Sequence, residues 1–279
     1  MREENRSPEL GQRPFLKWPG GKRWAARKIV PIIREHLCGT YYEPFLGGGA
    51  VFFALAAGKA VLSDLNPDLI NVYKQVKSNV GDVLKELKRI PVSGATYYKI
   101  RADRPQDPLM RAVRFLYLNR TAFAGMYRVN RRGEFNVPYG GGDRTPRILW
   151  ENGLLNSAAP LLRRTTILCQ DFGDILSDVM RGDVVYCDPT YTVAHDNNCF
   201  RRYNRSNFSD TDQARLANAA EAAAKKGATV IVSNAHHASI RAVHCRATRT
   251  IVLTRTSCVA PQVKDRRLVK EYLFIYCAR

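Results

Sequence analysis

Short apolar runs alternate along the chain with longer amphipathic stretches, and the first of these runs stop at a glycine or an acidic residue. The runs predict strands within residues 40–49, 59–66, 165–169, 183–191, 228–234 and 272–277. The amphipathic stretches predict helices over 22–37, 50–57, 67–90 and 209–226, with an interruption or kink at Pro31 and a break near Gly81. Alternation of strand and helix is typical of βαβ units, which require a parallel sheet.

The alternation lapses between about residues 91 and 160. This part holds helical stretches such as DPLMRAVRFLYLN and a long irregular run rich in arginine, glycine, asparagine and aromatic residues. We interpret the chain as one α/β domain, formed by 14–66 and 160–279, that is interrupted by an inserted domain over 67–159. Residues 1–13 are polar and charged, and we expect a flexible N-terminus there.

The charge of the chain points to a polyanionic partner. Lys and Arg number 44 against 25 Asp and Glu, a formal net charge of +19. Such an excess opposes compaction and steers a protein toward a polyanion, so nucleic acid is the first candidate. An anionic membrane surface is the second. The sequence has no clean basic amphipathic helix and no apolar run long enough to span a bilayer.

The cysteines and histidines predict neither a disulfide framework nor a metal site. Seven cysteines stand at wide spacings without a CxxC pair. Cys169 and Cys187 follow apolar runs, and we expect them to be small buried residues in a protein of a reducing, cytosolic compartment. His236 and His237 are adjacent and lack the i, i+4 spacing of two ligands on one helix face.

A glycine loop follows the first predicted strand in YYEPFLGGGAV. Gly47, Gly48 and Gly49 lie between a strand and a helix, where a cofactor could approach the backbone closely, although a tight structural turn explains them equally well. The dinucleotide fingerprint fails because position 52 is Phe, and no Gly-Lys-Ser/Thr follows. Asp64 closes the next predicted strand, where it could bind two ribose hydroxyls or cap the following helix.

The run DVVYCDPTY places Asp188-Pro189-Thr190-Tyr191 at the carboxyl end of a buried strand, where open α/β folds bind ligands. A strand-ending Asp-Pro turn is the plain interpretation. The chemical interpretation starts from the exocyclic amine of adenine, whose lone pair is delocalised into the ring. The Asp188 carboxylate and the Pro189 carbonyl could accept its two hydrogens and localise that pair, while the Tyr191 ring stacks on the base. The amine could then attack a methyl sulfonium in the adjacent pocket.

Together these segments resemble the Dam-type DNA adenine-N6 methyltransferases, the α group of the D12 class. The resemblance covers nearly all of residues 14–279 and preserves the order of the motifs. They are KWPGGK, EPFLGGGAVF, LSDLNPDLINVY, NRTAFAGMYRVNRRGEFNVPYG (119–140), DFGDIL (171–176), DPTY in place of DPPY, and RTSCVAPQVKDRRLVKEYLFIY (255–276). The stretch FLKWPGGKR (15–23), which by itself reads as a basic turn before a helix, is similar to the family's N-terminal motif.

The resemblance implies a Rossmann-like S-adenosylmethionine-dependent methyltransferase sheet with an inserted, mainly helical DNA-recognition domain that contains a hairpin. The methyl donor would be S-adenosylmethionine, and no metal would be required. The residues implied in catalysis are Asp188, Pro189, Thr190 and Tyr191. Those implied in cofactor binding are Lys17, Trp18, Glu43, Phe45, Gly47, Gly49, Asp64, Asp171 and Phe172, with Lys17 close to DPTY and Trp18 as an apolar wall.

The resemblance also implies that the enzyme acts on duplex DNA and flips the target adenine out of the stack. Arg128 would read a guanine, and Phe123 would wedge into the duplex. Candidates for phosphate contact are Arg120, Arg131, Arg132 and Arg144. The full set of residues implied in DNA binding is Arg120, Phe123, Met126, Arg128, Asn130, Arg132 and Tyr139. Met126 could equally be a core residue.

Two departures from the family pattern affect these expectations. Thr190 replaces a proline and so frees Pro189, which predicts a slower but competent enzyme. Ala124 stands where the family has a polar residue that helps to hold the duplex, which leaves the recognition sequence open, with GATC as the first interpretation. The alternatives are a catalytically impaired, sequence-specific DNA-binding protein of the same fold and a methyltransferase for RNA or protein.

The partners implied are double-stranded DNA and a restriction nuclease or another defence component encoded nearby, with no membrane. We expect a monomer or a transient dimer on DNA, located with the nucleoid in the cytoplasm of a bacterium or of a phage-infected cell. Whether the enzyme serves restriction-modification, regulation or protection of a mobile element is left open.

Overall fold

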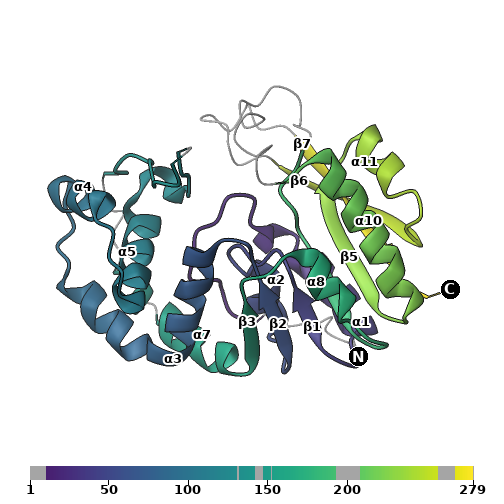
Figure 1. The fold of residues 1–279 in the computed structure, drawn as a ribbon, viewed down its shortest axis with the longest axis horizontal. Helices are drawn as coiled ribbons and strands as arrows, with labels where there is room; N and C mark the ends of the chain where they lie inside the picture. The colour runs from purple at the N-terminus through teal and green to yellow at the C-terminus, as the bar shows by residue number, and fades with distance from the viewer. Residues whose placement is uncertain are drawn as a thin grey trace, which may run out of the picture. The chain divides into compact units, whose positions relative to one another are not determined.

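The structure is a computed structural model that describes residues 11–130, 132–141, 147–151, 153–192, 208–256 and 268–278. Within these ranges seven strands form one sheet, in the order β3-β2-β1-β4-β5-β7-β6 (Figure 1). The chain divides into two compact units. The first comprises Met1–Pro31, Gly47–Gly58 and Asn66–Cys169, and the second comprises Ile32–Leu46, Lys59–Leu65 and Gln170–Arg279. The boundaries of an inserted domain at 67–159 stay a prediction.

Six strands belong to the second unit. Four of them are parallel neighbours, β2-β1-β4-β5; β7 pairs antiparallel with β5, and β6 pairs antiparallel with β7. The register pairs Tyr41 with Ala60 and with Val184, and Cys187 with Val232. Parallel strands end at one edge, so the residues that follow β1, β2 and β4 lie at the same side of this sheet. The bounds are β1 (Tyr41–Glu43), β2 (Ala60–Ser63), β4 (Val184–Cys187), β5 (Thr229–Ala235), β6 (Arg249–Thr256) and β7 (Leu268–Tyr276).

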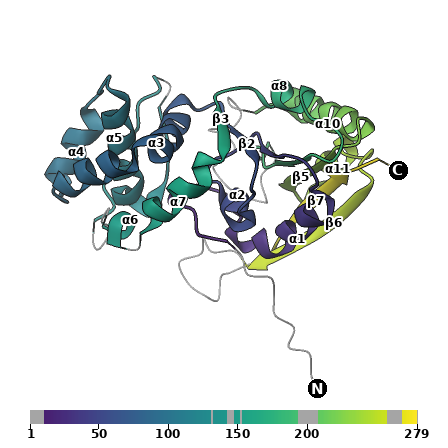
Figure 2. The ribbon, with the colours of Figure 1, turned by 90° about the horizontal axis from the view of Figure 1, so that it is seen from below.

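Three helices complete the second unit, α8 (Phe172–Ser177), α10 (Asp210–Lys225) and α11 (Ala238–Val243). Helix α10 packs on β5 and lies beside α8, as both ribbon views show (Figures 1 and 2). It begins with a capping box, in which the Ser209 side chain accepts from the Asp212 backbone and the Asp212 side chain accepts from the Ser209 backbone. Its buried face joins a core with β4, β5 and β7.

The first unit is mainly helical. Asn66 caps its long helix α3 by accepting from two backbone N–H groups, and Pro67 opens the first turn, where no N–H is needed. Asp107 and Pro108 begin α5 in the same way. The elements are η1 (Lys22–Trp24), α2 (Ala50–Leu55), α3 (Pro67–Arg89), α4 (Gly94–Ala102), α5 (Pro108–Thr121), η2 (Phe123–Gly125), α6 (Ile148–Glu151), α7 (Leu154–Arg163) and β3 (Thr165–Leu168).

The mixed α/β fold with its parallel strands confirms the predicted fold class, whereas several local expectations were wrong. Helix α1 (Ala26–His36) is not interrupted at Pro31, which is exposed, and Ile29, Val30 and Ile33 hold the apolar face of the helix in the core. The predicted break in α3 near Gly81 is confirmed, and it lies at Asn79.

Two further differences concern β6 and Cys169. The sequence reading missed β6, although RTIVLTRT is rich in β-branched residues. Cys169 is exposed just past the end of β3, while Cys187 is buried inside β4 as expected; Cys199 and Cys258 lie outside the described residues.

A buried histidine makes the second unit sensitive to acid. His244 is 1% exposed, stacks on Phe274 with ring centroids 4.5 Å apart, and shares a 2.7 Å hydrogen bond with the Tyr276 hydroxyl. Burial lowers the pKa of His244 to about 4. In an unfolded chain a histidine has a pKa of about 6.5. The neutral ring therefore stabilises the fold fully above that pH, and this stabilisation is lost as the pH falls from about 6.5 toward 4.

We expect the free energy of unfolding to fall by about 3 kcal/mol over this window because of His244 alone. Urea unfolding at a series of pH values checks this. The variant His244→Gln, which keeps a group that can pair with Tyr276 but does not titrate, should flatten the acid limb. Replacement of His36, at the end of α1, by glutamine should leave the wild-type dependence. An equally steep limb in His244→Gln would contradict the assignment.

Candidate active site

Hydrogen bonds of Ser63 gather three predicted cofactor residues at the carboxyl edge of the second unit's sheet. The Ser63 hydroxyl donates to the Gln170 carbonyl at 2.9 Å and accepts from the Gln170 N–H at 3.2 Å. The Leu46 N–H donates to the Ser63 carbonyl at 2.9 Å. Phe45, Asp64 and Asp171 are each adjacent in sequence to one of these bonded residues, so the contacts bring them to one place.

Three phenylalanines line this edge. Phe45 stacks on Phe172 with ring centroids 5.3 Å apart, and Phe208 contacts both rings at 5.6 and 5.8 Å. Phe172 is only 3% exposed and belongs to the core under α10. Two predicted cofactor residues, Phe45 and Phe172, therefore touch each other. Phe208 was not predicted, because nothing in its local sequence distinguishes it from a core residue.

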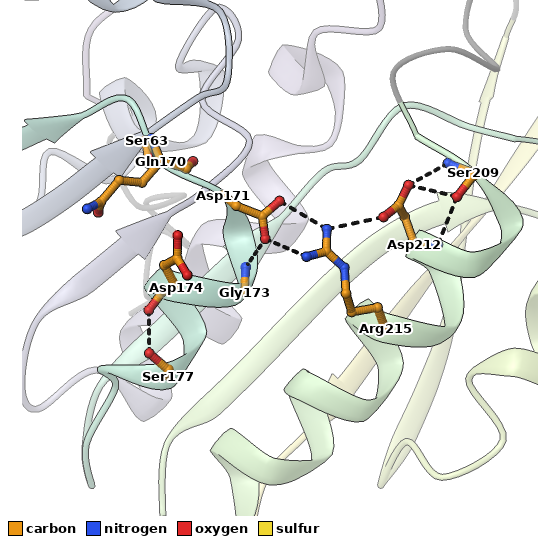
Figure 3. Close-up of polar contacts among 9 residues, drawn as sticks. All are labelled: Ser63, Gln170, Asp171, Gly173, Asp174, Ser177, Ser209, Asp212 and Arg215. Carbon is orange, nitrogen blue, oxygen red and sulfur yellow. Dashed lines mark hydrogen bonds and ion pairs between the residues drawn. The ribbon is translucent and has the colours of Figure 1, made fainter.

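The Asp171 carboxylate at this edge is held by several hydrogen bonds. It caps α8 by accepting from the Gly173 N–H at 2.8 Å, and Arg215 of α10 binds it with two hydrogen bonds of 2.8 and 3.0 Å (Figure 3). The Arg215 guanidinium also lies over the Phe172 ring, 4.1 Å from its centroid. The sequence reading named Asp171 but missed Arg215, which is far away along the chain.

Asp64 is not the cap of the following helix, since Asn66 takes that role. The ribose-binding role of Asp64 stays a prediction. Glu43, at the end of β1, is 3% exposed and accepts from the Tyr41 hydroxyl at 2.7 Å. Carboxylates can accept from ribose hydroxyls and from an adenine amine, and aromatic rings suit a purine. The acceptors and rings at this edge therefore fit an adenosine-containing cofactor.

The tetrapeptide DPTY follows β4 directly. Pro189 is buried, Thr190 is exposed, and Asp188 and Tyr191 are partly buried. The Tyr191 hydroxyl donates to Glu271 of β7 at 2.7 Å, and the other Glu271 oxygen lies 3.5 Å from Nε of Arg255. Burial, together with the negative charges of Asp188 and Glu271, raises the pKa of Tyr191 well above its usual value. Tyr191 is thus a protonated donor with a fixed ring.

A buried polar network supports the segment after DPTY. Asn234 of β5 donates to Gln213 of α10 at 2.9 Å, and Gln213 donates to the Thr192 hydroxyl at 3.5 Å. Asn234 is fully buried and Gln213 is 1% exposed. Buried amides are kept only where their hydrogen bonds are made. The network therefore fixes the start of α10 to the strand beside DPTY, and its members gave no signal in the sequence.

In the first unit, the glycine loop packs against Trp18. A Cβ atom at Gly47 would lie 2.7 Å from the Trp18 indole and one at Gly48 would lie 2.9 Å from Trp18 Cβ. Gly47 and Gly49 have φ values of +46° and +65°, which favour glycine. Gly47 also accepts from the Tyr73 hydroxyl at 3.0 Å. The close packing of Trp18 and the positive φ values explain why glycine stands at positions 47 and 49 without a ligand.

Trp18 and Lys17 tie that loop to the segment 119–140. The Trp18 ring stacks on Tyr127, 5.2 Å away, and on Phe115 of α5. Lys17 and Asn119 exchange two hydrogen bonds of 3.0 and 2.7 Å, and the Lys17 side chain covers Gly125 so closely that a Cβ there would clash. Lys17 and Trp18, from the motif KWPGGK, thus lie against the predicted DNA-binding segment. No role for Tyr127 was predicted from the sequence.

The segment 119–140 folds back on itself. Isolated antiparallel bridges join Ala122 to Tyr139 and Val129 to Phe135. Within it, Arg128 donates to the Asn136 side chain at 2.7 Å and to the Asn136 carbonyl at 3.2 Å. These contacts hold the predicted guanine-reading side chain across the hairpin.

The other residues predicted for DNA binding lie around this hairpin. Asn130 closes the turn by accepting from the backbone of Arg132 and Glu134. Phe123 is 50% exposed, Arg132 is exposed, and Met126 is partly buried. Tyr139 packs on Tyr97 with ring centroids 5.3 Å apart. Arg131 and Arg144 lie outside the described residues, as does the stretch 257–267 within the motif 255–276.

Arg120 is the least ordinary of the predicted DNA-binding residues. It sits in the last turn of α5 and is 8% exposed, and its Nε has no hydrogen-bond partner among the described residues. Burial lowers the pKa of Arg120 to about 10, so the side chain is still charged at neutral pH. A buried donor of a charged side chain that makes no hydrogen bond is costly to the fold.

Comparison with known proteins gives the family. The D12 class N6 adenine-specific DNA methyltransferase family matches residues 18–264. The chain is 36% identical over 247 residues to the type II methyltransferase M.MjaIII of Methanocaldococcus jannaschii, covering 81% of this chain and 85% of that protein. It is 34% and 33% identical over 274 residues to DNA adenine methylases of Salmonella typhi and Escherichia coli, covering 95% of each chain.

The chain therefore belongs to the D12 class N6 adenine-specific DNA methyltransferases. It is an enzyme that methylates adenine in DNA, and its methyl donor is S-adenosylmethionine. Among the residues that the structure describes, no group of side chains could hold a metal ion. No helix in the same ranges is both long and apolar enough to cross a membrane.

Proposed function

We propose that this protein transfers the methyl group of S-adenosylmethionine to N6 of an adenine that is flipped out of duplex DNA, with GATC as its recognition sequence. The observation that carries the proposal lies in the second unit. The carboxyl ends of parallel strands β1, β2 and β4 present Phe45, Asp64 and Asp188 at one edge, and the Ser63–Gln170 contacts bring Asp171 there. The arrangement supports an adenosine site beside an amine-binding tetrapeptide.

S-adenosylmethionine supplies an electrophilic methyl group on a sulfonium. Asp64 would accept from its ribose hydroxyls and Asp171 from its adenine amine, beside Phe45 and Phe172. Asp188 and the Pro189 carbonyl would accept the two hydrogens of the target amine and so localise its lone pair. Tyr191, held by Glu271 at 2.7 Å, would stack on the target base.

In the first unit, Arg128 would pair with a guanine of the site, and Phe123, half exposed beside the hairpin, would enter the space left by the flipped base. Arg120 and Arg132 would bind phosphates. We further propose that the protein works as a monomer or a transient dimer on DNA, close to the nucleoid. The type II names of some relatives support a partner restriction nuclease.

Single-molecule sequencing of plasmid DNA treated with the purified protein and S-adenosylmethionine tests the proposal. The expected result is N6-methyladenine at GATC and at no other sequence. Modified adenines in other contexts would overturn the proposed site while leaving the reaction in place. Sequence-specific DNA binding without any transfer would favour the catalytically impaired alternative.

Replacement of the exposed Thr190 by proline is expected to raise the single-turnover rate of methyl transfer. A proline after Pro189 restricts the backbone that carries the acceptor carbonyl. We expect an increase of about tenfold, equal to roughly 1.4 kcal/mol in the barrier. Rapid-quench measurements with tritiated cofactor check this. Thr190→Ala, which removes the hydroxyl without adding a ring, should show no gain, and a large fall in Thr190→Pro would contradict the account of Pro189.

A further inference from the structure

Arg215 stands at the cofactor edge of the second unit without a role in the proposed chemistry. We propose that Arg215 is a positioning residue, which fixes the plane of the Asp171 carboxylate so that it presents one free lone pair to the adenine amine of the cofactor. The inference rests on the proposed function, because it takes Asp171 as the residue that binds this amine.

The geometry of the pair is that of a two-pronged clamp. Nη1 of Arg215 donates to Oδ1 of Asp171 at 2.8 Å, and Nη2 donates to Oδ2 at 3.0 Å (Figure 3). Without this fork, the Gly173 N–H would be the one donor among the described residues that holds the carboxylate, through Oδ1 at 2.8 Å. One hydrogen bond leaves the carboxylate free to rotate, whereas two parallel bonds from a planar guanidinium set its plane.

The bidentate pair with Arg215 leaves part of the acceptor capacity of the Asp171 carboxylate available. A carboxylate has about four lone-pair sites, two on each oxygen. Within the described part of the chain, Oδ1 accepts from Gly173 and Arg215, and Oδ2 accepts from Arg215 only. One site therefore remains on Oδ2, enough for a single N–H of an exocyclic amine. The Asp171 side chain is 27% exposed, so the carboxylate is accessible to a ligand.

Arg215 is itself held from three directions. Its Nη2 also donates to Asp212 at 3.1 Å, and its guanidinium lies over the Phe172 ring. Asp212 is locked in the capping box with Ser209, as Figure 3 shows. The next residue, Gln213, is bound to Asn234 of β5. The first turns of α10 thus form a rigid base, which links the orientation of Asp171 to the strand beside DPTY.

The test compares Arg215→Gln with Arg215→Lys. We expect Arg215→Gln to raise the KM for S-adenosylmethionine by about tenfold or more, the loss typical of a disturbed hydrogen bond to a charged group. The kcat at saturating cofactor should stay close to that of the wild type. Arg215→Lys restores the charge but not the planar fork, so its KM should lie between the two.

A second readout isolates the adenine amine. Calorimetry gives the affinities for S-adenosylhomocysteine and for S-inosylhomocysteine, in which a carbonyl replaces the amine. The wild type should prefer the adenosyl compound strongly. In Arg215→Gln this preference should shrink by about tenfold, mainly through weaker adenosyl binding. A loss of general stability would weaken both ligands equally and would leave the ratio unchanged.

Arg246 provides the matched control. It pairs with Glu221 of the same helix α10 at 2.7 Å, and its side chain is 49% exposed against 48% for Arg215. Arg246→Gln removes an arginine–carboxylate pair of equal exposure away from Asp171, and it should change neither the KM nor the ligand preference.

The outcomes distinguish a failure of the proposed function from a failure of the role proposed for Arg215. If wild-type protein neither binds S-adenosylhomocysteine nor methylates DNA, the proposed function fails. If the wild type does both and Arg215→Gln keeps its KM and its ligand preference, only the role of Arg215 is overturned. A fall in kcat at unchanged cofactor KM would also overturn it. Should Arg215→Gln not fold, Arg215→Lys carries the same comparisons.

Discussion

Replacement of Asp188 by asparagine is expected to lower the rate of methyl transfer by about a hundred- to a thousandfold. The amine nitrogen of adenine becomes positively charged as it attacks the methyl group. A carboxylate beside it stabilises that charge most in the transition state, whereas an amide oxygen can still accept a hydrogen but carries no charge. The effect should therefore fall on kcat, with the KM for S-adenosylmethionine and the affinity for DNA close to those of the wild type.

Single-turnover transfer of tritium from labelled cofactor to a GATC duplex measures this rate. The same strand supplies a matched control at its other end. Asp183, which precedes β4, is 6% exposed and accepts from the backbone of Thr40 at 2.7 Å and of Met180 at 2.9 Å. Asp183→Asn would set an amide donor against one of these N–H groups, so the melting temperature should fall while kcat is kept. Equal losses of kcat in both variants would contradict the special role of Asp188.

The strands that precede the chemistry were predictable because their signal is local. Each is a short apolar run that ends at Glu43, Asp64 or Asp188, and the buried parallel sheet demands such runs. Antiparallel β6, RTIVLTRT, carries a comparable local signal in its β-branched residues, so it was predictable in the same way. The break in α3 was predictable as well, because Gly81 is the obvious helix breaker in the sequence and the chain bends close to it, at Asn79.

The supporting residues of the site could not be predicted, because their partners are distant along the chain. Nothing in SDTDQAR indicates that Arg215 reaches Asp171, and nothing around Glu271 indicates that it accepts from Tyr191. Trp18 could be named only through the resemblance. Its contact with Gly47 and Tyr127 depends on two loops meeting, which no periodicity encodes.

Two arginines of one helix illustrate the same limit. Arg114 and Arg120 both lie in α5, and burial lowers the pKa of each. Arg114 donates to the carbonyls of Ile100 and Arg101 at 3.0 and 2.8 Å, so its hydrogen bonds hold α4 against α5. Arg120 has a buried Nε with no such acceptor among the described residues. The sequence shows two arginines, and only the fold shows that one of them is satisfied.

Replacement of Arg120 by methionine is therefore expected to stabilise the DNA-free protein and to weaken its binding to DNA. Methionine fills a similar volume without a charge, which removes the cost of the unsatisfied donor, and we expect the free energy of unfolding to rise by about 1–3 kcal/mol. If a DNA phosphate satisfies Arg120 in the complex, its loss should weaken binding by about tenfold and reduce the salt dependence by about one phosphate contact.

Arg114→Met should have the opposite sign in the first measurement, because it removes satisfied hydrogen bonds between two helices. Urea unfolding of the two variants, and titration of a fluorescent GATC duplex at several salt concentrations, give both quantities. If Arg120→Met is more stable but binds DNA with the wild-type salt slope, Arg120 destabilises the fold without contacting a DNA phosphate. A less stable one would show that the guanidinium is already satisfied in the free protein. Higher stability together with a lower salt slope is expected only if the buried Arg120 guanidinium, unsatisfied in the free protein, pairs with a DNA phosphate in the complex.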